Sequence, residues 1–324
     1  MARSSQAMMQ LRLVLQVSLL WIISALIVLV SSADAQDGLP KTTRLTDLFP
    51  HLSFEQKFSV FFGASNVRTY NNGSLVNIAL SKVSGSGLAS RNKYYYGFFS
   101  AAMRLPPGYT SGVVVAFYLS NSGIFPHNHD EIDFELLGHQ NHKDWVLQTN
   151  MYGNGSVSTG REEKFRVWFD PTADYHEYSI IWNNHHIVFL VDNIPIREVE
   201  HTEAISSVYP SKPMSIYATI WDGSEWATHG GKYPANYKYA PFVASLGKME
   251  IQGCTFNPNS TAIETCSKGG TTSSLDPVEG QDFITLSRNQ KQGLDWARST
   301  RMIYSYCKDK GRFQVLPPEC KTQN

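Results

Sequence analysis

The sequence contains few cysteines: there are four among 324 residues, and all of them lie in the last quarter of the chain. They are Cys254, Cys266, Cys307 and Cys320. No CxxC pair is present and no histidine pair stands beside them, so we do not expect a zinc site. In an exported protein these cysteines should form disulfides, and the sequence alone permits three pairings.

The sequence also lacks any excess of charge, since 28 basic residues balance 28 acidic ones. This balance argues against a nucleic-acid-binding tail and against a basic membrane-binding patch. Acidic residues and histidines do not gather at metal-ligand spacing away from one strand described below. We therefore expect a monomer with no metal and no cofactor, and with no nucleic-acid partner.

Long apolar runs are missing except at the N-terminus, where residues 13–30 are almost wholly apolar and follow Arg3 and Arg12. Ala33-Asp34-Ala35 then offers a cleavage site, so residues 1–35 are predicted to be a secretory signal peptide. The run is long enough to serve as an uncleaved membrane anchor instead. The cleavage site favours removal, which would release an exported protein that does not stay in the membrane.

No helical period of useful length occurs between about residues 40 and 253. This span contains short β-branched and aromatic runs separated by turn residues, a pattern typical of a β-sandwich or barrel. We expect a lead-in segment at Asp37–Pro50 and a large β domain over residues 36–253. Strands are predicted at Tyr94–Leu105, Val113–Leu119, Trp145–Tyr152, Tyr178–Trp182, Ile187–Val191 and Met214–Trp221.

Residues 254–324 are predicted to form an extension to this domain. Residues 255–280 are rich in Ser, Thr, Gly and Pro and indicate a loop. A helix is expected at Thr285–Arg298, capped by Thr285 and weakened by Gly293. Within the β domain, His185-His186 is expected to lie in a solvated hairpin turn.

The strongest pattern in the chain lies at residues 129–138, HDEIDFELLG. Apolar residues alternate there with Glu131, Asp133 and Glu135, which is the period of a β-strand. One face of the strand is therefore apolar and the other carries three carboxylates. Because like charges in a row repel, this arrangement indicates chemical use rather than structural support. The alternative is a solvated acidic face.

Glycoside hydrolysis is the chemistry that this row suits best, because it requires one ionised and one protonated carboxyl group. Glu131 and Glu135 would have Cα atoms roughly 13 Å apart at about 3.3 Å per residue. Side chains leaning together could approach the separation of about 5–5.5 Å that is found in retaining enzymes. Asp133 lies between them, and crowding should drive their pKa values apart.

These residues resemble the active-site motif of the plant xyloglucan endotransglucosylase/hydrolases. The resemblance implies an all-β fold, a concanavalin-like β-jelly-roll sandwich. The concave face of this sandwich would hold the glucan. The resemblance also implies that Glu131 is the nucleophile, Asp133 its helper, Glu135 the general acid/base and His129 a supporting residue. The motif here ends in Leu136-Leu137-Gly138 where the family has Phe-Leu-Gly, a change on the core side of the strand.

The resemblance also implies a set of substrate-binding residues spread over several segments. Gln148 and Asn150 alternate on one face of a strand, and amides suit sugar hydroxyls. Trp221 and Trp226 belong to a second family segment, WDGSEWATHGG, in which Gly230 would let the backbone approach a glucan. The remaining expected contacts are Tyr118, Arg161 and Glu162, with Tyr304 and Arg312 in the extension.

The family also pairs neighbouring cysteines, which implies the disulfides Cys254–Cys266 and Cys307–Cys320. Glycosylation sequons begin at Asn72, Asn154 and Asn259. Many family members carry a glycan directly after the catalytic motif, where this chain has His139. The sequon at Asn154 lies in a nearby loop.

The expected activity is therefore retaining cleavage of the β-1,4-glucan backbone of xyloglucan, with religation to another xyloglucan chain or oligosaccharide in the plant cell wall. The length of the loop from Asn150 to Glu162 favours transfer over hydrolysis. Alternatives are a xyloglucan-specific hydrolase, a mixed-linkage or cellulose-directed glucanase, and a non-catalytic glucan-binding lectin. The intact acidic triad argues against the lectin.

Overall fold

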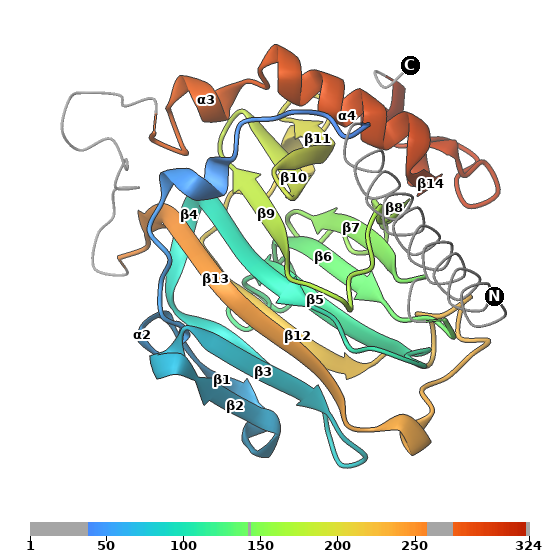
Figure 1. Ribbon diagram of the computed structural model, residues 1–324. Helices are drawn as coiled ribbons and strands as arrows, with labels where there is room; N and C mark the ends of the chain where they lie inside the picture. The colour runs from blue at the N-terminus through green and yellow to red at the C-terminus, as the bar shows by residue number, and fades with distance from the viewer. Residues whose placement is uncertain (1–37, 142–143, 258–274, 322–324) are drawn as a thin grey trace, which may run out of the picture. The chain divides into compact units, whose positions relative to one another are not determined.

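The computed structural model describes residues 38–141, 144–257 and 275–321 (Figure 1). The predicted all-β fold is confirmed: antiparallel strands make up most of the regular secondary structure in this part of the chain. Their bounds are β1 Phe58–Phe62, β2 Val67–Tyr70, β3 Leu75–Leu80, β4 Ser86–Arg104, β5 Val113–Ser120, β6 Glu131–Leu137, β7 Val146–Tyr152, β8 Glu163–Arg166, β9 His176–Trp182, β10 His186–Val191, β11 Ile194–Glu200, β12 Met214–Asp222, β13 Phe242–Thr255 and β14 Met302–Ser305.

The strands form two layers that share β4. We call the layer β1-β4-β12-β5-β6-β7-β8-β14 the front sheet and the layer β2-β3-β13-β4-β9-β10-β11 the back sheet. The first half of β4 pairs with β12, and its second half pairs with β9 and β13. The change occurs at Tyr96 and Gly97, whose φ angles are 59° and 148°. A Cβ on Gly97 would lie 2.4 Å from the carbonyl oxygen of Gln252, so glycine is required at this bend.

The core lies between the two sheets and follows the alternation predicted for the strand that carries Glu131, Asp133 and Glu135. Ile132, Phe134 and Leu136 of β6 are fully buried. The ring of Phe134 meets Tyr178 of β9 and Phe189 of β10 edge-on, with ring centroids 5.9 and 5.2 Å apart. Because neighbouring residues point to opposite faces, the acidic side chains of β6 are directed away from this core.

The lead-in segment runs along the back sheet, beginning with the residues that follow Lys41. Arg44 donates two hydrogen bonds of 2.9 Å to Glu177 of β9. Leu52 then forms an isolated bridge with Met249 of β13. The predicted signal peptide, residues 1–35, lies outside the described residues. Within the described ranges, no helix has the length and hydrophobicity of a membrane span.

Regular helices are short and stand mainly in the C-terminal part of the described chain: α2 Phe54–Lys57, α3 Gln281–Ile284 and α4 Arg288–Thr300. The predicted start of the last helix was wrong. Its N-cap is Ser287 rather than Thr285, because Ser287 and Gln290 form a reciprocal capping box. Gly293 faces Ile194 and Pro195 of β11, which explains a glycine within this helix.

The prediction of a solvated turn was wrong for His186. Its side chain is only 3% exposed and lies at the start of β10. Nδ1 lies 2.7 Å from Glu198 Oε1, and Nε2 lies 2.5 Å from the carbonyl oxygen of Phe283. The extension covers this histidine, and a contact between segments so far apart in the chain leaves no local mark in the sequence.

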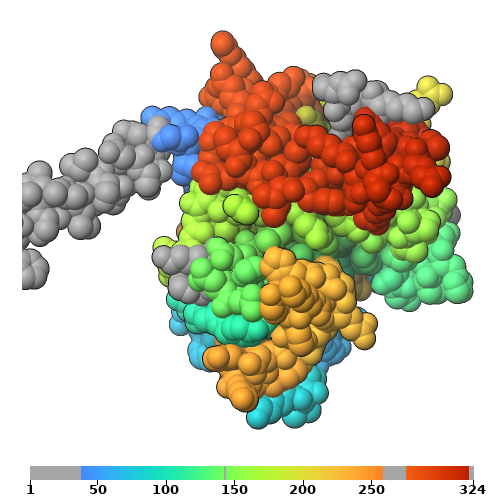
Figure 2. All heavy atoms as spheres, turned by 90° about the vertical axis from the view of Figure 1, so that its right-hand side faces the viewer, coloured from blue at the N-terminus to red at the C-terminus, as the bar shows by residue number. Residues whose placement is uncertain are grey.

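The extension also adds the last strand of the front sheet, because β14 pairs with β8. Figure 2 shows the extension, in red, as a band against the green segments of the sandwich. The predicted disulfide Cys307–Cys320 closes its final loop. The other predicted pair includes Cys266, which lies outside the described residues, as does the sequon at Asn259.

Candidate active site

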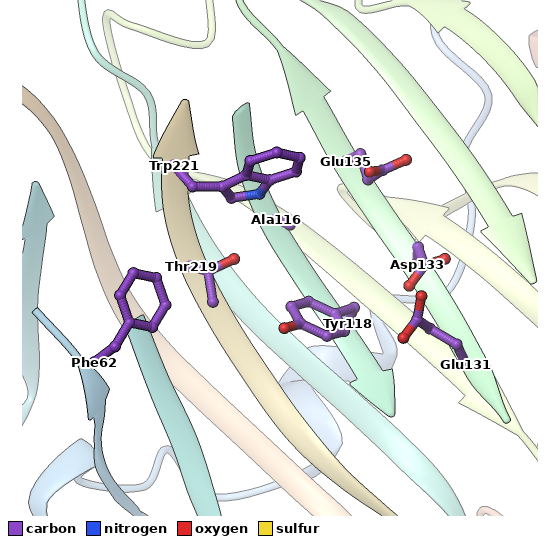
Figure 3. A pocket seen from close by; sticks show the side chains of 8 residues that line it. All are labelled: Phe62, Ala116, Tyr118, Glu131, Asp133, Glu135, Thr219 and Trp221. Carbon is purple, nitrogen blue, oxygen red and sulfur yellow. The ribbon is translucent and has the colours of Figure 1, made fainter. Parts of the chain in front are cut away.

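The acidic side chains of β6 face a hollow of about 320 Å³ on the outer side of the front sheet. Glu131, Asp133 and Glu135 all line it, and Figure 3 shows them on one strand opposite Tyr118 and Trp221. The floor comes from neighbouring strands, since Tyr118 of β5 pairs with Asp133. The structure therefore brings together the three carboxyl groups that the sequence pattern singled out.

Burial keeps these carboxyl groups poorly solvated and raises the pKa of each one. Burial raises the pKa of Glu135 to about 7, the charge of Glu131 adds to the rise, and a hydrogen bond from Gln148 opposes it. Burial, followed by the charges of Glu131 and Glu135, raises the pKa of Asp133 well above its usual value. Burial also raises the pKa of Glu131, against a hydrogen bond from Ser120 and the charge of His129. Glu135 is thus poised to exchange a proton near neutral pH.

The residues that precede the acids hold the start of β6 in place. His129 lies beside the first acid, with Nε2 4.0 Å from Glu131 Oε2. Asp130 is fully buried and accepts hydrogen bonds of 2.7–2.8 Å from the backbone of Asn154 and from Lys212. Two loops are therefore tied to the residue directly before Glu131. Asp130 belongs to the sequence motif, but the alternation of the strand assigns it no role.

Gln148 and Asn150 of β7 lie on the acidic face, as the alternation predicted. They pair across the strands with Glu135 and Asp133, respectively. Gln148 Nε2 donates a hydrogen bond of 2.5 Å to Glu135 Oε2. Asn150 Oδ1 accepts a hydrogen bond of 2.9 Å from the backbone N–H of Arg161. Gln148 therefore orients Glu135, and Asn150 holds the loop that follows β7.

We expect Gln148→Met to raise the pKa of Glu135, because the amide donor that stabilises the ionised form is removed. The basic limb of the profile of kcat/KM against pH should move to higher pH. The lost hydrogen bond to a charged group, worth roughly 1.5–3 kcal/mol, should lower kcat/KM by about tenfold or more. Steady-state kinetics from pH 5 to 9 measures both effects. A basic limb that stays at the same pH would contradict the effect of the Gln148 hydrogen bond on the pKa of Glu135.

Arg161 differs from the expected substrate contact, because its side chain is turned into the protein and only 4% of the residue is exposed. Nε donates to Glu319 Oε1 at 2.6 Å, and one terminal nitrogen donates to Ser156 Oγ at 3.1 Å. Glu319 also accepts a hydrogen bond from the hydroxyl of Tyr306. This buried ion pair fastens the extension to the loop between β7 and β8.

Glu319→Ala should therefore destabilise the fold by roughly 3–5 kcal/mol, because it leaves the guanidinium of Arg161 buried without its carboxylate. Equilibrium unfolding in urea measures this free energy. Arg312→Ala is the matched control, since it removes an ion pair of the same extension whose arginine side chain is 37% exposed. Arg312→Ala should lower the free energy of unfolding by no more than about 1 kcal/mol. Equal losses in the two variants would contradict the role given to Arg161.

Glu162 and Arg312, both expected to contact substrate, lie together at the edge of the front sheet. Arg312 donates to the two carboxylate oxygens of Glu162 at 2.6 and 3.4 Å. Tyr304 of β14 donates to Asp309 Oδ2 at 2.8 Å, and Lys164 lies 5.7 Å from its ring centroid. The structure thus places these residues as a polar group where the extension meets β8.

The tryptophan segment lies across the front sheet from β8. Trp221, at the end of β12, lines the acidic hollow, and its ring centroid is 5.8 Å from that of Trp226. Trp226 packs beside Ala227 against Val114 and Leu137, so this ring also helps to hold the segment on the sheet. Gly230 has a φ of 66° with open space around its α-carbon, a conformation that glycine adopts without strain.

Three further residues line the acidic hollow and were not predicted from the sequence: Phe62, Ala116 and Thr219. Ala116 and Thr219 alternate with Tyr118 and Trp221 along predicted strands, so the period of two could have placed them on the same face. Phe62 of β1 also lines the hollow, but no strand was specified there. In the described part of the chain, no three His, Cys, Asp or Glu side chains are grouped to hold a metal.

Solved structures of similar fold include a Crh5 transglycosylase in complex with NAG, with a TM-score of 0.50 and 22% identity over 68% of this chain and 84% of that chain. The laminarinase catalytic domain from Thermotoga maritima likewise has a TM-score of 0.50, with 18% identity over 58% of this chain and 80% of that chain. At such low identity, these structures support the fold alone.

Other proteins share a much higher sequence identity with this chain. Probable xyloglucan endotransglucosylase/hydrolase protein 27 of Arabidopsis thaliana is 47% identical over 84% of this chain and 79% of its own length. Xyloglucan endotransglucosylase/hydrolase protein 3 of the same plant is 39% identical over 83% and 89%. Residues 54–239 match the glycosyl hydrolases family 16, and residues 274–320 match the xyloglucan endo-transglycosylase C-terminus. The chain therefore belongs to the xyloglucan endotransglucosylase/hydrolase group of glycosyl hydrolases family 16.

Proposed function

We propose that this protein is a xyloglucan endotransglucosylase acting by retention. Glu131 attacks the anomeric carbon of the glucan backbone while Glu135 protonates the departing oxygen, giving a covalent glycosyl-enzyme. Glu135 then removes a proton from the incoming hydroxyl, and the new glycosidic bond forms as Glu131 leaves. Asp133 assists Glu131. The observation that carries the proposal is the row of three carboxyl groups on one face of β6, with Asp133 buried and Glu131 and Glu135 partly buried, in a chain of this family.

The acceptor chain is proposed to lie towards β8 and β14. A second hollow of about 590 Å³ is lined there by Lys164, Gly230 and Ile303, among others. The extension borders this region through Tyr304 and through the Arg312–Glu162 pair. A sugar acceptor held on such a surface would compete with water for the glycosyl-enzyme, which favours transfer. In this proposal, residues 36–253 are the catalytic domain and residues 254–324 are its extension.

We further propose that the protein is secreted and acts in the cell wall. The N-terminal leader of residues 1–35 supports export, as does the disulfide Cys307–Cys320. Asn72 and Asn154 are both exposed and lie in turns, so a glycosyltransferase could reach them. These features suit a glycoprotein that acts on polymers outside the cell.

Incubation with xyloglucan, with and without a labelled xyloglucan oligosaccharide, tests the proposal. Transfer predicts label in the polymer and little increase in reducing ends. Chain shortening without incorporation would identify a hydrolase instead, and binding without either reaction would identify a lectin. Parallel assays on cellulose derivatives and mixed-linkage glucan would reveal a different glucanase.

A further inference from the structure

The edge strand β1 exposes apolar side chains to an unusual degree. Phe61 is 57% exposed and Val60 is 45% exposed. Among the described residues this strand pairs only with β4, so none of them forms a strand along its other side. Natural proteins usually protect such edges with charges or proline, because an exposed apolar edge invites aggregation. Exposed aromatic surface at this place therefore indicates binding.

A β-bulge directs two consecutive aromatic rings of this strand towards the cleft. Val60 pairs with Leu88 and Phe62 pairs with Gly87, which leaves Phe61 as the additional residue. Phe62 lines the acidic hollow, and the centroid of Phe61 lies 5.2 Å from that of Tyr217 on the cleft face of β12. In a regular strand, neighbouring side chains would point to opposite faces, so the bulge is what brings both rings to this face.

Gly87 of β4 leaves the space that the ring of Phe62 occupies on the cleft face. A Cβ on Gly87 would lie 2.7 Å from a ring carbon of Phe62 and 2.7 Å from the methyl group of Thr219. A larger residue at position 87 would displace the ring from the cleft. The glycine therefore keeps room for an aromatic wall on the front sheet.

The aromatic surface continues from Phe61 to the catalytic acids. The rings of Tyr217 and Tyr118 stack with centroids 4.9 Å apart, and Tyr118 is the cross-strand partner of Asp133. β1 and β6 are separated by four strand spacings of about 4.8 Å, or roughly 19 Å. This distance spans several pyranose rings, so an extended glucan crossing the strands would pass over these aromatic side chains.

We propose that Phe61 and Tyr217 form a distal binding platform for the donor glucan, at the end of the cleft opposite the extension. This proposal rests on the proposed function, which places the acceptor against β8 and β14 and leaves the β1 side to the donor. The faces of aromatic rings pack well on the C–H faces of sugars. Continuity of the rings with the acidic hollow favours a glucan chain over a second protein copy as the occupant.

The test compares transfer kinetics for xyloglucan donors of increasing backbone length. Phe61→Ala should lower kcat/KM about tenfold for long donors, because it removes an aromatic contact surface. The loss should be smaller for the shortest donors, and the KM for the acceptor should not change. Phe61→Tyr should restore most of the loss. Tyr70→Ala, which removes an exposed aromatic residue from β2 of the back sheet, is the matched control.

Several results would overturn the platform: equal losses for short and long donors, a raised acceptor KM, or unchanged kinetics. Size-exclusion chromatography supplies a further outcome, because a wild-type dimer that dissociates in Phe61→Ala would assign the surface to self-association. Failure of the proposed function would be seen separately, as wild-type protein that does not act on xyloglucan. Circular dichroism and the recovery in Phe61→Tyr distinguish loss of binding from loss of folding.

Discussion

Glu131→Gln is expected to lower both transfer and hydrolysis by on the order of ten-thousand-fold, because the amide cannot form the glycosyl-enzyme. The geometry leaves no substitute nearby, since Asp133 is more deeply buried and its pKa is raised well above the usual value by burial and by its two neighbours. Transfer of a labelled acceptor and release of reducing ends measure the two activities. Residual turnover within tenfold of wild type would remove Glu131 from its proposed role.

The fold of this variant should remain intact, which makes the loss of activity interpretable. Burial already disfavours the ionised form of Glu131, and a neutral amide of the same shape removes that cost. We therefore expect a Tm at neutral pH equal to or higher than that of the wild type. A lower Tm together with lost activity would indicate a structural role for this carboxylate.

Glu135→Gln is expected to lower kcat/KM by roughly 100- to 10,000-fold on xyloglucan, the range found when a general acid is lost. The pH profile provides the more specific readout. Burial raises the pKa of Glu135 to about 7, and the reaction requires its protonated form, so wild-type kcat/KM should fall as the pH rises through about 7. Glu135→Gln should lack this basic limb. Retention of the limb would assign it to another group.

The acid side of the pH profile depends on Glu131, which must be ionised whereas Glu135 must be protonated. Glu131 must be ionised to attack, and burial raises its pKa above the usual value. Wild-type kcat/KM should therefore fall on the acid side at a pH above the ordinary carboxylate value of 4.5. The two limbs together give a bell-shaped profile between these limits.

The sequence contained enough information to predict the strand that carries the acids. Alternation alone placed Ile132, Phe134 and Leu136 in the core and the acidic residues on the other face, and the same rule placed Gln148 and Asn150 beside them. Side-chain direction in a strand depends on local geometry with a period of two. The register between β6 and its neighbours was not predicted and comes from the structure.

Contacts between distant segments could not be predicted in this way. Arg161 and Glu319 are 158 residues apart, and only the folded extension brings them together. His186 likewise depends on the extension, which covers it through Phe283. In both places polar residues satisfy one another in the interior, whereas the isolated sequence suggested a substrate contact or a solvated turn.

The bulge at Phe61 illustrates a different limit. A single additional residue changes which side chains share a face, and the sequence of β1 does not mark where the extra residue falls. Consequently the aromatic residues Phe61 and Phe62 at the β1 end of the cleft emerged only from the structure, whereas its acidic centre could be predicted from the sequence.

Trapping the glycosyl-enzyme tests the central claim most directly. A xyloglucan oligosaccharide donor with a fluorine at C2 and a good leaving group at C1 should form a covalent bond to the wild-type protein. The bound fluorosugar should then be released only slowly. Peptide mass spectrometry should then find the sugar on Glu131. An unmodified protein, or a sugar attached to Asp133, Glu135 or any other residue, would contradict the account.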